Sequence, residues 1–415
     1  MRLVSVFPYA YIVAWMLLAF LPYVYYSTKA YVALQFFLAI FAFSYTVYFV
    51  ANYKLIPYFK FLLIFVGILA IYGIVLIFVG DVVICRMGNY VIENNRYILW
   101  LFNSMLTVVP IYIFTCKGVL NDRVMRILFF IMLAASLLAF YVTYQQMLIE
   151  AALIDSHQEE FTITAVYILL SILPLVLLFR KHISLQFILL CVFFFFFIMS
   201  AKRGVILLGS ISILVLLWGI LSNYSIKKKT IFFLLSLVIL AVLYKFTMHQ
   251  LETSVYLASR YQDTLEGYSS QRDVYLTTIF EYMENNYSIR SFLFGIGAQG
   301  TLSVNISWAH NDWVAILLEH GIVGLLPYVA FWISFIYTWI KSWSMSRESF
   351  VVIGALVIIG FGKTLFSMFY LPIAEGVIIS SGFYAIALGY YLGKTFPQYS
   401  SEEIRKIKSR RGMVR

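Results

Sequence analysis

Long apolar stretches separated by short polar clusters dominate the chain. The stretches are nearly continuous and approach the ~20 residues that a helix needs to cross a hydrocarbon layer. They lack the strict alternation and ~10-residue length of the strands in a membrane barrel. The pattern therefore predicts an all-α, polytopic membrane protein with about twelve transmembrane helices. We place the spans at residues 7–26, 31–50, 61–80, 97–116, 127–146, 163–179, 183–200, 204–222, 230–248, 322–340, 350–370 and 377–393.

The predicted spans divide the chain into four parts. Residues 1–248 form an N-terminal bundle of about nine transmembrane helices, and 310–399 contain the C-terminal ones. Between them, 249–309 is the longest polar interruption, and a helical stripe that begins at Arg272 predicts short helices within it. Residues 400–415 form a basic tail. A single charge precedes the first apolar run without a small-residue cleavage site, so we expect a retained first span rather than a signal peptide.

Composition excludes an ordinary soluble protein. Hydrophobic residues make up 63% of the chain and charged residues 12%, whereas soluble domains carry roughly 45–50% and about 25%. The net charge of +11 indicates topology rather than nucleic-acid binding, because Lys and Arg collect in the cytoplasmic loops of membrane proteins. Placing both termini in the cytoplasm puts about two thirds of the 30 Lys and Arg residues on that side. The loop 249–309 and a break at 201–204 are then predicted to lie on the outer face.

Two adjacent cations, Lys202 and Arg203, interrupt a long apolar stretch at this break. Basic residues are disfavoured on the outer face, and Gly204 allows another group to approach closely. The planar donor fork of Arg203 suits a phosphate-bearing ligand. The structural alternative is that both side chains extend to the membrane surface to reach water. Arg272 is a further candidate, for which a surface salt bridge with a neighbouring acid is the alternative.

His310, Asn311 and Asp312 directly precede a short apolar run. A histidine is the side chain best suited to proton transfer near neutral pH, so His310 is a candidate general base. Asn311 or Asp312 could instead cap a helix that enters the membrane. His320 borders a predicted helix break at Gly321 and is assigned a structural role.

Motifs for several other kinds of site are absent from the sequence. It has no His/Cys cluster or carboxylate pair with metal-ligand spacing, and no phosphate-binding glycine loop followed by Lys and Ser or Thr. The three cysteines are far apart and indicate no disulfide framework. No metal or cofactor is therefore expected. None of the 19 Asp and Glu residues falls in the middle of a predicted span, which argues against a proton-coupled pump.

The region 195–330 resembles the O-antigen ligase/polymerase superfamily of bacterial inner-membrane proteins. The similarity rests on Ser200-Ala-Lys-Arg-Gly204, Arg272, Phe294-Gly-Ile-Gly297, Ala309-His-Asn-Asp312, Glu319 and Gly321-x-x-Gly324. Members of this family transfer glycans from undecaprenyl pyrophosphate at the periplasmic face, without metal or nucleotide sugar. The resemblance implies that Arg203 and Arg272 hold the diphosphate and that His310 orients or deprotonates the acceptor hydroxyl. It also implies substrate contacts by Lys202, Asn311, Asp312, Glu319, Gly295 and Gly297. Lys202 replaces a serine that the family often has before the motif arginine.

The resemblance implies a metal-independent glycosyltransferase of the bacterial inner membrane. We favour a repeat-unit polymerase for O-antigen, capsular or exopolysaccharide, because the residues after His310 and the segment Lys363-Thr-Leu-Phe-Ser-Met-Phe look more like polymerases. An O-antigen ligase, which transfers the glycan to lipid A-core or protein, is the alternative. A flippase or other transporter of the same oligosaccharide is a further one, although no paired repeats are evident. The expected partners are undecaprenyl-pyrophosphate-linked oligosaccharide, membrane lipids, a chain-length regulator and a flippase, with no nucleic acid.

Overall fold

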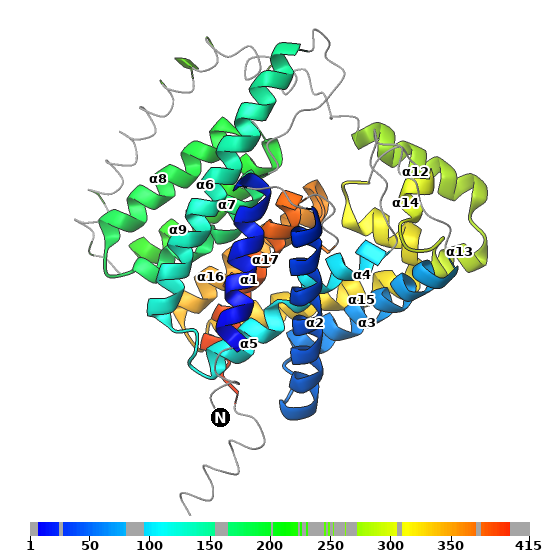
Figure 1. Ribbon diagram of the computed structural model, residues 1–415, viewed down its shortest axis with the longest axis horizontal. Coiled ribbons are helices and arrows are strands. Elements are labelled where there is room, and N and C mark those ends of the chain that lie inside the picture. Colours follow the sequence, from blue (N-terminus) through cyan, green and yellow to red (C-terminus); the bar gives the residue numbers. More distant parts are fainter. Residues whose placement is uncertain are drawn as a thin grey trace, which may run out of the picture.

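The computed structural model describes residues 7–24, 28–79, 95–153, 165–200, 202–222, 272–304, 309–370 and 375–398, with a few single residues between 225 and 262. These residues form helices and no strand (Figure 1), which confirms the all-α prediction for the described part of the chain. The helical segments are α1 (Phe7–Val24), α2 (Thr28–Asn52), α3 (Pro57–Val79), α4 (Asn95–Leu101), η2 (Phe102–Leu106), α5 (Val108–Cys116), α6 (Asp122–Leu153), α7 (Val166–Ile172), η3 (Leu173–Phe179), α8 (Ile183–Met199), α9 (Arg203–Leu221), α12 (Arg272–Asn286), α13 (Ile289–Phe294), α14 (Gly300–Val304), α15 (Asp312–Ser342), α16 (Arg347–Phe366) and α17 (Glu375–Thr395).

Eight of the described segments are long and apolar enough to cross a membrane, which supports a multi-pass membrane protein. They are Phe7–Val24, Lys29–Asn52, Pro57–Phe78, Arg96–Cys116, Asp122–Gln146, Arg203–Leu221, Asp312–Ser342 and Arg347–Phe366. Two shorter apolar segments, Val166–Phe179 and Ile183–Met199, coincide with further predicted spans. The predicted span 230–248 lies almost entirely outside the described residues, and the tail 400–415 lies wholly outside them. The number of about twelve spans stays a prediction.

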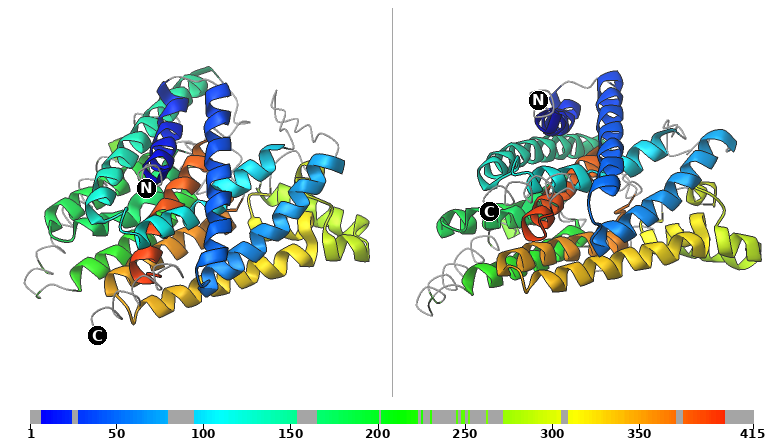
Figure 2. Two further views of the ribbon diagram at one scale, coloured as in Figure 1. Left: turned by 60° about the horizontal axis from the view of Figure 1, so that its bottom comes forward. Right: turned by 90° about the horizontal axis from the view of Figure 1, so that it is seen from below.

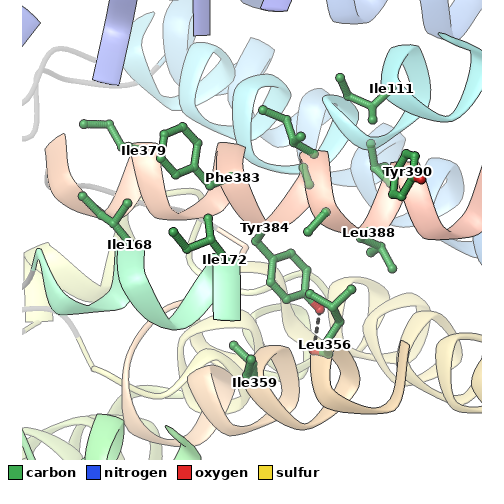
Figure 3. Close-up of a cluster of buried hydrophobic side chains, with 14 of the residues drawn as sticks. Ile111, Ile168, Ile172, Leu356, Ile359, Ile379, Phe383, Tyr384, Leu388 and Tyr390 are labelled. Atoms are coloured by element: carbon green, nitrogen blue, oxygen red, sulfur yellow. Dashed lines mark hydrogen bonds between the residues drawn. The ribbon is translucent and has the colours of Figure 1, made fainter. Parts of the chain in front are cut away.

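α17 lies in the interior of the bundle, where it packs against α1, α5, α7 and α16. Figure 3 shows Ile168 and Ile172 of α7 and Leu356 and Ile359 of α16 beside α17, whose Tyr384 points toward α16. These apolar side chains are buried. The Tyr384 hydroxyl donates to the Leu356 carbonyl of α16 (2.7 Å), so the polar atom of this ring is paired inside the core (Figure 3).

Glycines allow α17 to approach its neighbours closely. A Cβ at Gly382 would lie 2.1 Å from the Trp15 ring of α1, and one at Gly389 would lie 2.7 Å from the Val108 carbonyl oxygen of α5. Both distances are below van der Waals contact, so neither position accepts a side chain without movement. Small residues at such interfaces let membrane helices gain packing energy through close backbone contact.

α15 begins at Asp312 rather than at the predicted residue 322, and it passes through a kink at Gly321. The glycine has a φ of 60° and a ψ of −159°, which is not helical. Asp312 and Glu319 are fully buried within this membrane-length helix. Asp312 is the first residue of α15 and Glu319 lies just before its kink, so neither falls in the predicted span 322–340.

Three short helices, α12, α13 and α14, gather at one end of the molecule beside α15 (Figures 1 and 2). α12 begins at Arg272, as the helical stripe in the sequence predicts. α13 packs against α15, and α14 contacts both α12 and α15. α15 in turn runs beside α3 and α16 (Figure 2). The packing thus brings the segment around Arg272 close to the start of α15.

Candidate functional site

The break between α8 and α9 places Lys202 and Arg203 between two apolar helices, as the sequence predicts. α8 ends at Met199, and Arg203 is the first residue of α9. Lys202 has an extended backbone, and its amide donates to Ser200 Oγ (3.3 Å). The side chains of Lys202 and Arg203 are partly buried. Lys202 therefore immediately precedes α9 and Arg203 opens it, so both cations lie at the junction of two apolar helices.

The ring of Tyr167, on α7, brings Lys202 together with a lysine of α16. Lys202 Nζ lies 5.1 Å from the ring centroid, and Lys363 Nζ lies 5.6 Å from it. An ammonium within about 6 Å of an aromatic face is attracted by the quadrupole of the ring. Gly204 faces the same side chain, since a Cβ there would lie 3.6 Å from the Tyr167 hydroxyl. The close approach expected at Gly204 is therefore made by Tyr167 and by Phe366 of α16.

Neither Tyr167 nor Lys363 was among the predicted site residues, although Lys363 begins a segment that looks more like polymerases. A lone lysine in the apolar run 350–370 is a signal that could have drawn attention to Lys363, because charged residues inside membrane helices are rare. Lys363 is 1% exposed, its Nζ donates to Ser380 Oγ of α17 (3.3 Å), and the charge of Asp312 attracts it. These partners offset part of the cost of burying a cation.

His310 lies just before α15, with a φ of 49°. Burial lowers the pKa of its imidazole to about 4, and the positive charges of Arg272 and Lys202 act in the same direction. Arg272 also interacts electrostatically with Tyr167. The structure therefore brings His310, Arg272 and Lys202 from three separate segments into one region, next to Arg203. The imidazole is neutral at pH 7 and has a lone pair that can accept a proton.

Asn311 and Asp312 are engaged in bonds that stabilise the start of α15. Asn311 Oδ1 accepts hydrogen bonds from the amides of Trp313 (3.0 Å) and Val314 (3.3 Å), which is the geometry of an N-cap. Asp312 accepts a hydrogen bond from the Tyr328 hydroxyl (2.8 Å) and another from the amide of Phe369 (3.0 Å). The capping alternative therefore describes Asn311, and Asp312 links α15 to the segment that follows α16.

The glycine turn at 295–297 packs against the kink of α15. The amides of Ile296 and Gly297 donate to the carbonyls of Leu318 and Glu319 (both 2.9 Å). Gly295 has a φ of 71°, and a Cβ there would lie 2.3 Å from the Glu319 carbonyl oxygen. Only glycine permits this approach of two backbones. By contrast, a Cβ at Gly297 would meet no atom within 4 Å, so of the two predicted substrate-contacting glycines this one has free space beside it.

Glu319 and His320, the residues just before the kink, are fully buried. Glu319 Oε1 accepts a hydrogen bond from the amide of Thr301 in α14 (3.3 Å). His320 Nε2 lies 3.2 Å from the Tyr97 hydroxyl, and the ring packs edge-on against Tyr72 with 4.6 Å between centroids. Both side chains are enclosed by protein, which fits the structural role assigned to His320. Glu319 is enclosed in the same way and contacts α14.

The predicted site residues thus fall into two groups. His310, Arg272 and Lys202 share one region with Tyr167, and Arg203 adjoins it, whereas Gly295 and Glu319 form the crossing of the glycine turn with α15. Within the described ranges, no group of three or more His, Cys, Asp and Glu residues could hold a metal ion. No protein-family model matches the chain, and no curated protein matches it significantly.

Proposed function

We propose that this protein is a membrane glycosyltransferase that polymerises lipid-linked repeat units of a bacterial surface polysaccharide. The donor would be a glycan on undecaprenyl pyrophosphate, and the acceptor a hydroxyl of another lipid-linked repeat unit. The observation that carries the proposal is the gathering of His310 with Arg272 and Lys202, next to Arg203. A neutral imidazole beside several fixed cations is the combination that a diphosphate leaving group and a hydroxyl nucleophile require.

The cationic residues and His310 have different roles in the proposed reaction. The acceptor oxygen attacks the anomeric carbon of the donor, and the bond from that carbon to the diphosphate oxygen breaks. Arg203, Arg272 and Lys202 stabilise the negative charge that develops on the departing diphosphate. His310 takes the proton of the acceptor hydroxyl. A bound diphosphate would also offset the positive charges that act on His310, so substrate binding would raise its pKa and make it a stronger base.

The proposed setting is the bacterial inner membrane, with both termini in the cytoplasm and the site at the periplasmic face. The segment 249–309, which includes α12, α13 and α14, would be the periplasmic loop between two sets of transmembrane helices. In this location a chain-length regulator and a flippase would be the neighbouring proteins. No metal or further cofactor takes part in the proposed step.

Reconstitution of the purified protein tests the proposal. The protein is placed in liposomes with the lipid-linked repeat unit isolated from the producing cells, and the products are separated on a gel. We expect a ladder of longer lipid-linked chains. His310→Ala, Arg272→Ala and Arg203→Ala should each abolish the ladder at unchanged protein level and insertion, because each removes one element of charge or proton transfer.

The same assay separates the alternatives. Transfer that occurs only after lipid A-core is supplied would identify an O-antigen ligase and refute polymerisation. Movement of the lipid-linked oligosaccharide across the bilayer without any change in its length would identify a transporter. Full activity in all three variants would overturn the assignment of the site.

A further inference from the structure

A cluster of buried polar side chains surrounds the crossing of the glycine turn with α15. Within the described part of the chain, six of their polar atoms lack a hydrogen bond of good geometry: Gln299 Oε1 and Nε2, Thr301 Oγ1, Glu319 Oε2, His320 Nδ1 and Tyr370 Oη. All five residues are 0% exposed. Buried polar atoms in folded proteins are almost always well paired. Six poorly paired atoms at one place therefore indicate a further binding partner.

Glu319 lies at the centre of this cluster. Its Oε1 accepts a hydrogen bond from the Thr301 amide (3.3 Å), and the backbone of Gln299 and the hydroxyl of Tyr370 face the same carboxylate. The His320 ring lies on another side, with Nε2 3.8 Å from Glu319 Oε2. The residues around this carboxylate thus come from the segment after the glycine turn, α14, α15 and the segment after α16.

The charge of this carboxylate is not balanced by a protein cation. Among the described residues, the ion pair recorded for Glu319 is the one with His320. His320 Nε2 is already engaged with Tyr97 (3.2 Å), and a protonated ring would leave a charged N–H at Nδ1 buried without an acceptor. A buried charged donor without a partner is strongly unfavourable. A neutral His320 is therefore the more stable form, and an ionised Glu319 requires another counter-ion.

We propose that the cluster binds one monovalent cation, with Na⁺ as the first candidate, through oxygen atoms of Glu319, Gln299, Thr301 and Tyr370. Carboxylate, amide and hydroxyl oxygens are the ligands that hard cations prefer. One carboxylate balances one positive charge, whereas a divalent ion would leave an uncompensated charge in the interior. The ion would tie the glycine turn and α14 to α15, the helix that begins two residues after His310.

Thermal unfolding in defined salts tests the site without any activity assay. The full-length protein is purified in choline chloride, and choline is replaced stepwise by Na⁺, K⁺ or Li⁺ at constant ionic strength. A ligand that binds only the folded state raises the Tm with a saturable dependence on its concentration. We expect such a rise for at least one small cation, with Na⁺ the most effective. A Tm that depends on ionic strength alone, equally in choline, would overturn the proposal.

Two variants locate the effect, and a third serves as a control. Glu319→Gln keeps the shape of the side chain but removes its charge, and Thr301→Val removes one oxygen ligand in a nearly isosteric way. Both should lose the cation-dependent rise in Tm. Ser212→Ala removes a buried hydroxyl on α9 that makes no hydrogen bond among the described residues, and this variant should keep the rise. An unchanged cation response in Thr301→Val would overturn the assignment of the ligands, even if Glu319→Gln did not fold.

Discussion

Replacement of Gly295 by alanine should destabilise the protein more than alanine at Gly118 or Gly297, which also have a positive φ but have open space where a Cβ would lie. The backbone of Gly295, with a φ of 71° and a ψ of −172°, lies in a region that is essentially restricted to glycine. A new Cβ would also lie 2.3 Å from both the carbonyl carbon and the oxygen of Glu319 and 2.4 Å from the His320 amide nitrogen. These are backbone atoms of a buried helix, so they cannot rotate away.

The expected cost follows from these two effects. The unfavourable backbone conformation costs about 1–3 kcal/mol, and overpacking against a fixed backbone costs a further ~1–3 kcal/mol. Separating the turn from α15 would relieve the contact, but it would break the hydrogen bonds from Ile296 and Gly297, each of which contributes about 0.5–1.5 kcal/mol. Separating the turn from α15 would therefore cost about as much free energy as the steric overlap itself. We expect Gly295→Ala to lower the free energy of unfolding by roughly 2–6 kcal/mol.

Two matched variants separate the contributions. Gly118 has nearly the same φ, 72°, but a Cβ there would meet nothing within 4 Å, so Gly118→Ala reports the backbone effect alone, about 1–2 kcal/mol. Gly67 lies inside α3 with open space around it, and alanine there should be neutral or slightly stabilising.

Tryptophan fluorescence during heating measures all three variants in the same detergent. An unfolding entropy of ~2.1 cal/mol/K per residue over the whole chain corresponds to roughly 1 °C per kcal/mol. Gly295→Ala should therefore unfold several degrees below wild type and clearly below Gly118→Ala. Equal Tm values for Gly295→Ala and Gly118→Ala would refute the backbone crossing.

Three further predictions follow from the site. The pKa of His310 is lowered to about 4 from an ordinary value of about 6.5. Between about pH 6.5 and about pH 4 the unfolded chain therefore binds a proton that the folded chain does not, so the stability of the protein falls as the pH falls through this range. His310→Gln should flatten the Tm-versus-pH curve between these values, and an unchanged slope would contradict burial of the imidazole. Asn311→Ala should lower stability by about 1 kcal/mol while Asn311→Ser retains it; equal loss in the two variants, measured by thermal unfolding, would exclude the N-cap. If the proposed function is correct, Tyr167→Leu should weaken binding of undecaprenyl pyrophosphate, measured by thermophoresis, by about tenfold or more, because both lysines lose their aromatic partner. Two controls should bind normally: Tyr167→Phe, which keeps the ring, and Tyr48→Leu, which removes a ring that lies 5.1 Å from Lys117 in another part of the protein. Normal binding by Tyr167→Leu would show that the Tyr167 ring does not position the lysines.

The features of this chain that depend on local sequence were predictable. Near-continuous apolar runs identify helices that face lipid or core, and the break at Lys202, the helix that starts at Arg272 and the N-cap at Asn311 each follow from a few neighbouring residues. Charge, helix periodicity and capping chemistry act over one or two helical turns, so a single stretch contains the whole signal. The predicted span begins only at residue 322, because Glu319, His320 and Gly321 interrupt the apolar pattern, whereas α15 continues across them and tertiary contacts bury and partly satisfy these residues.

Other features depend on residues that meet only in the folded chain. Tyr167, Lys202 and Lys363 come from α7, the α8–α9 break and α16, and nothing in the stretch around any one of them indicates the other two. Distant segments also meet where Gly295 packs against the kink at Gly321. The same is true around Glu319, which is approached by Gln299, Thr301 and Tyr370. The amino-acid sequence alone is enough to predict a helical membrane protein, because each long apolar run requires a hydrocarbon or core environment. Which cations, hydroxyls and glycines become neighbours depends on the tertiary fold, because helix packing depends on side-chain shape across the whole bundle.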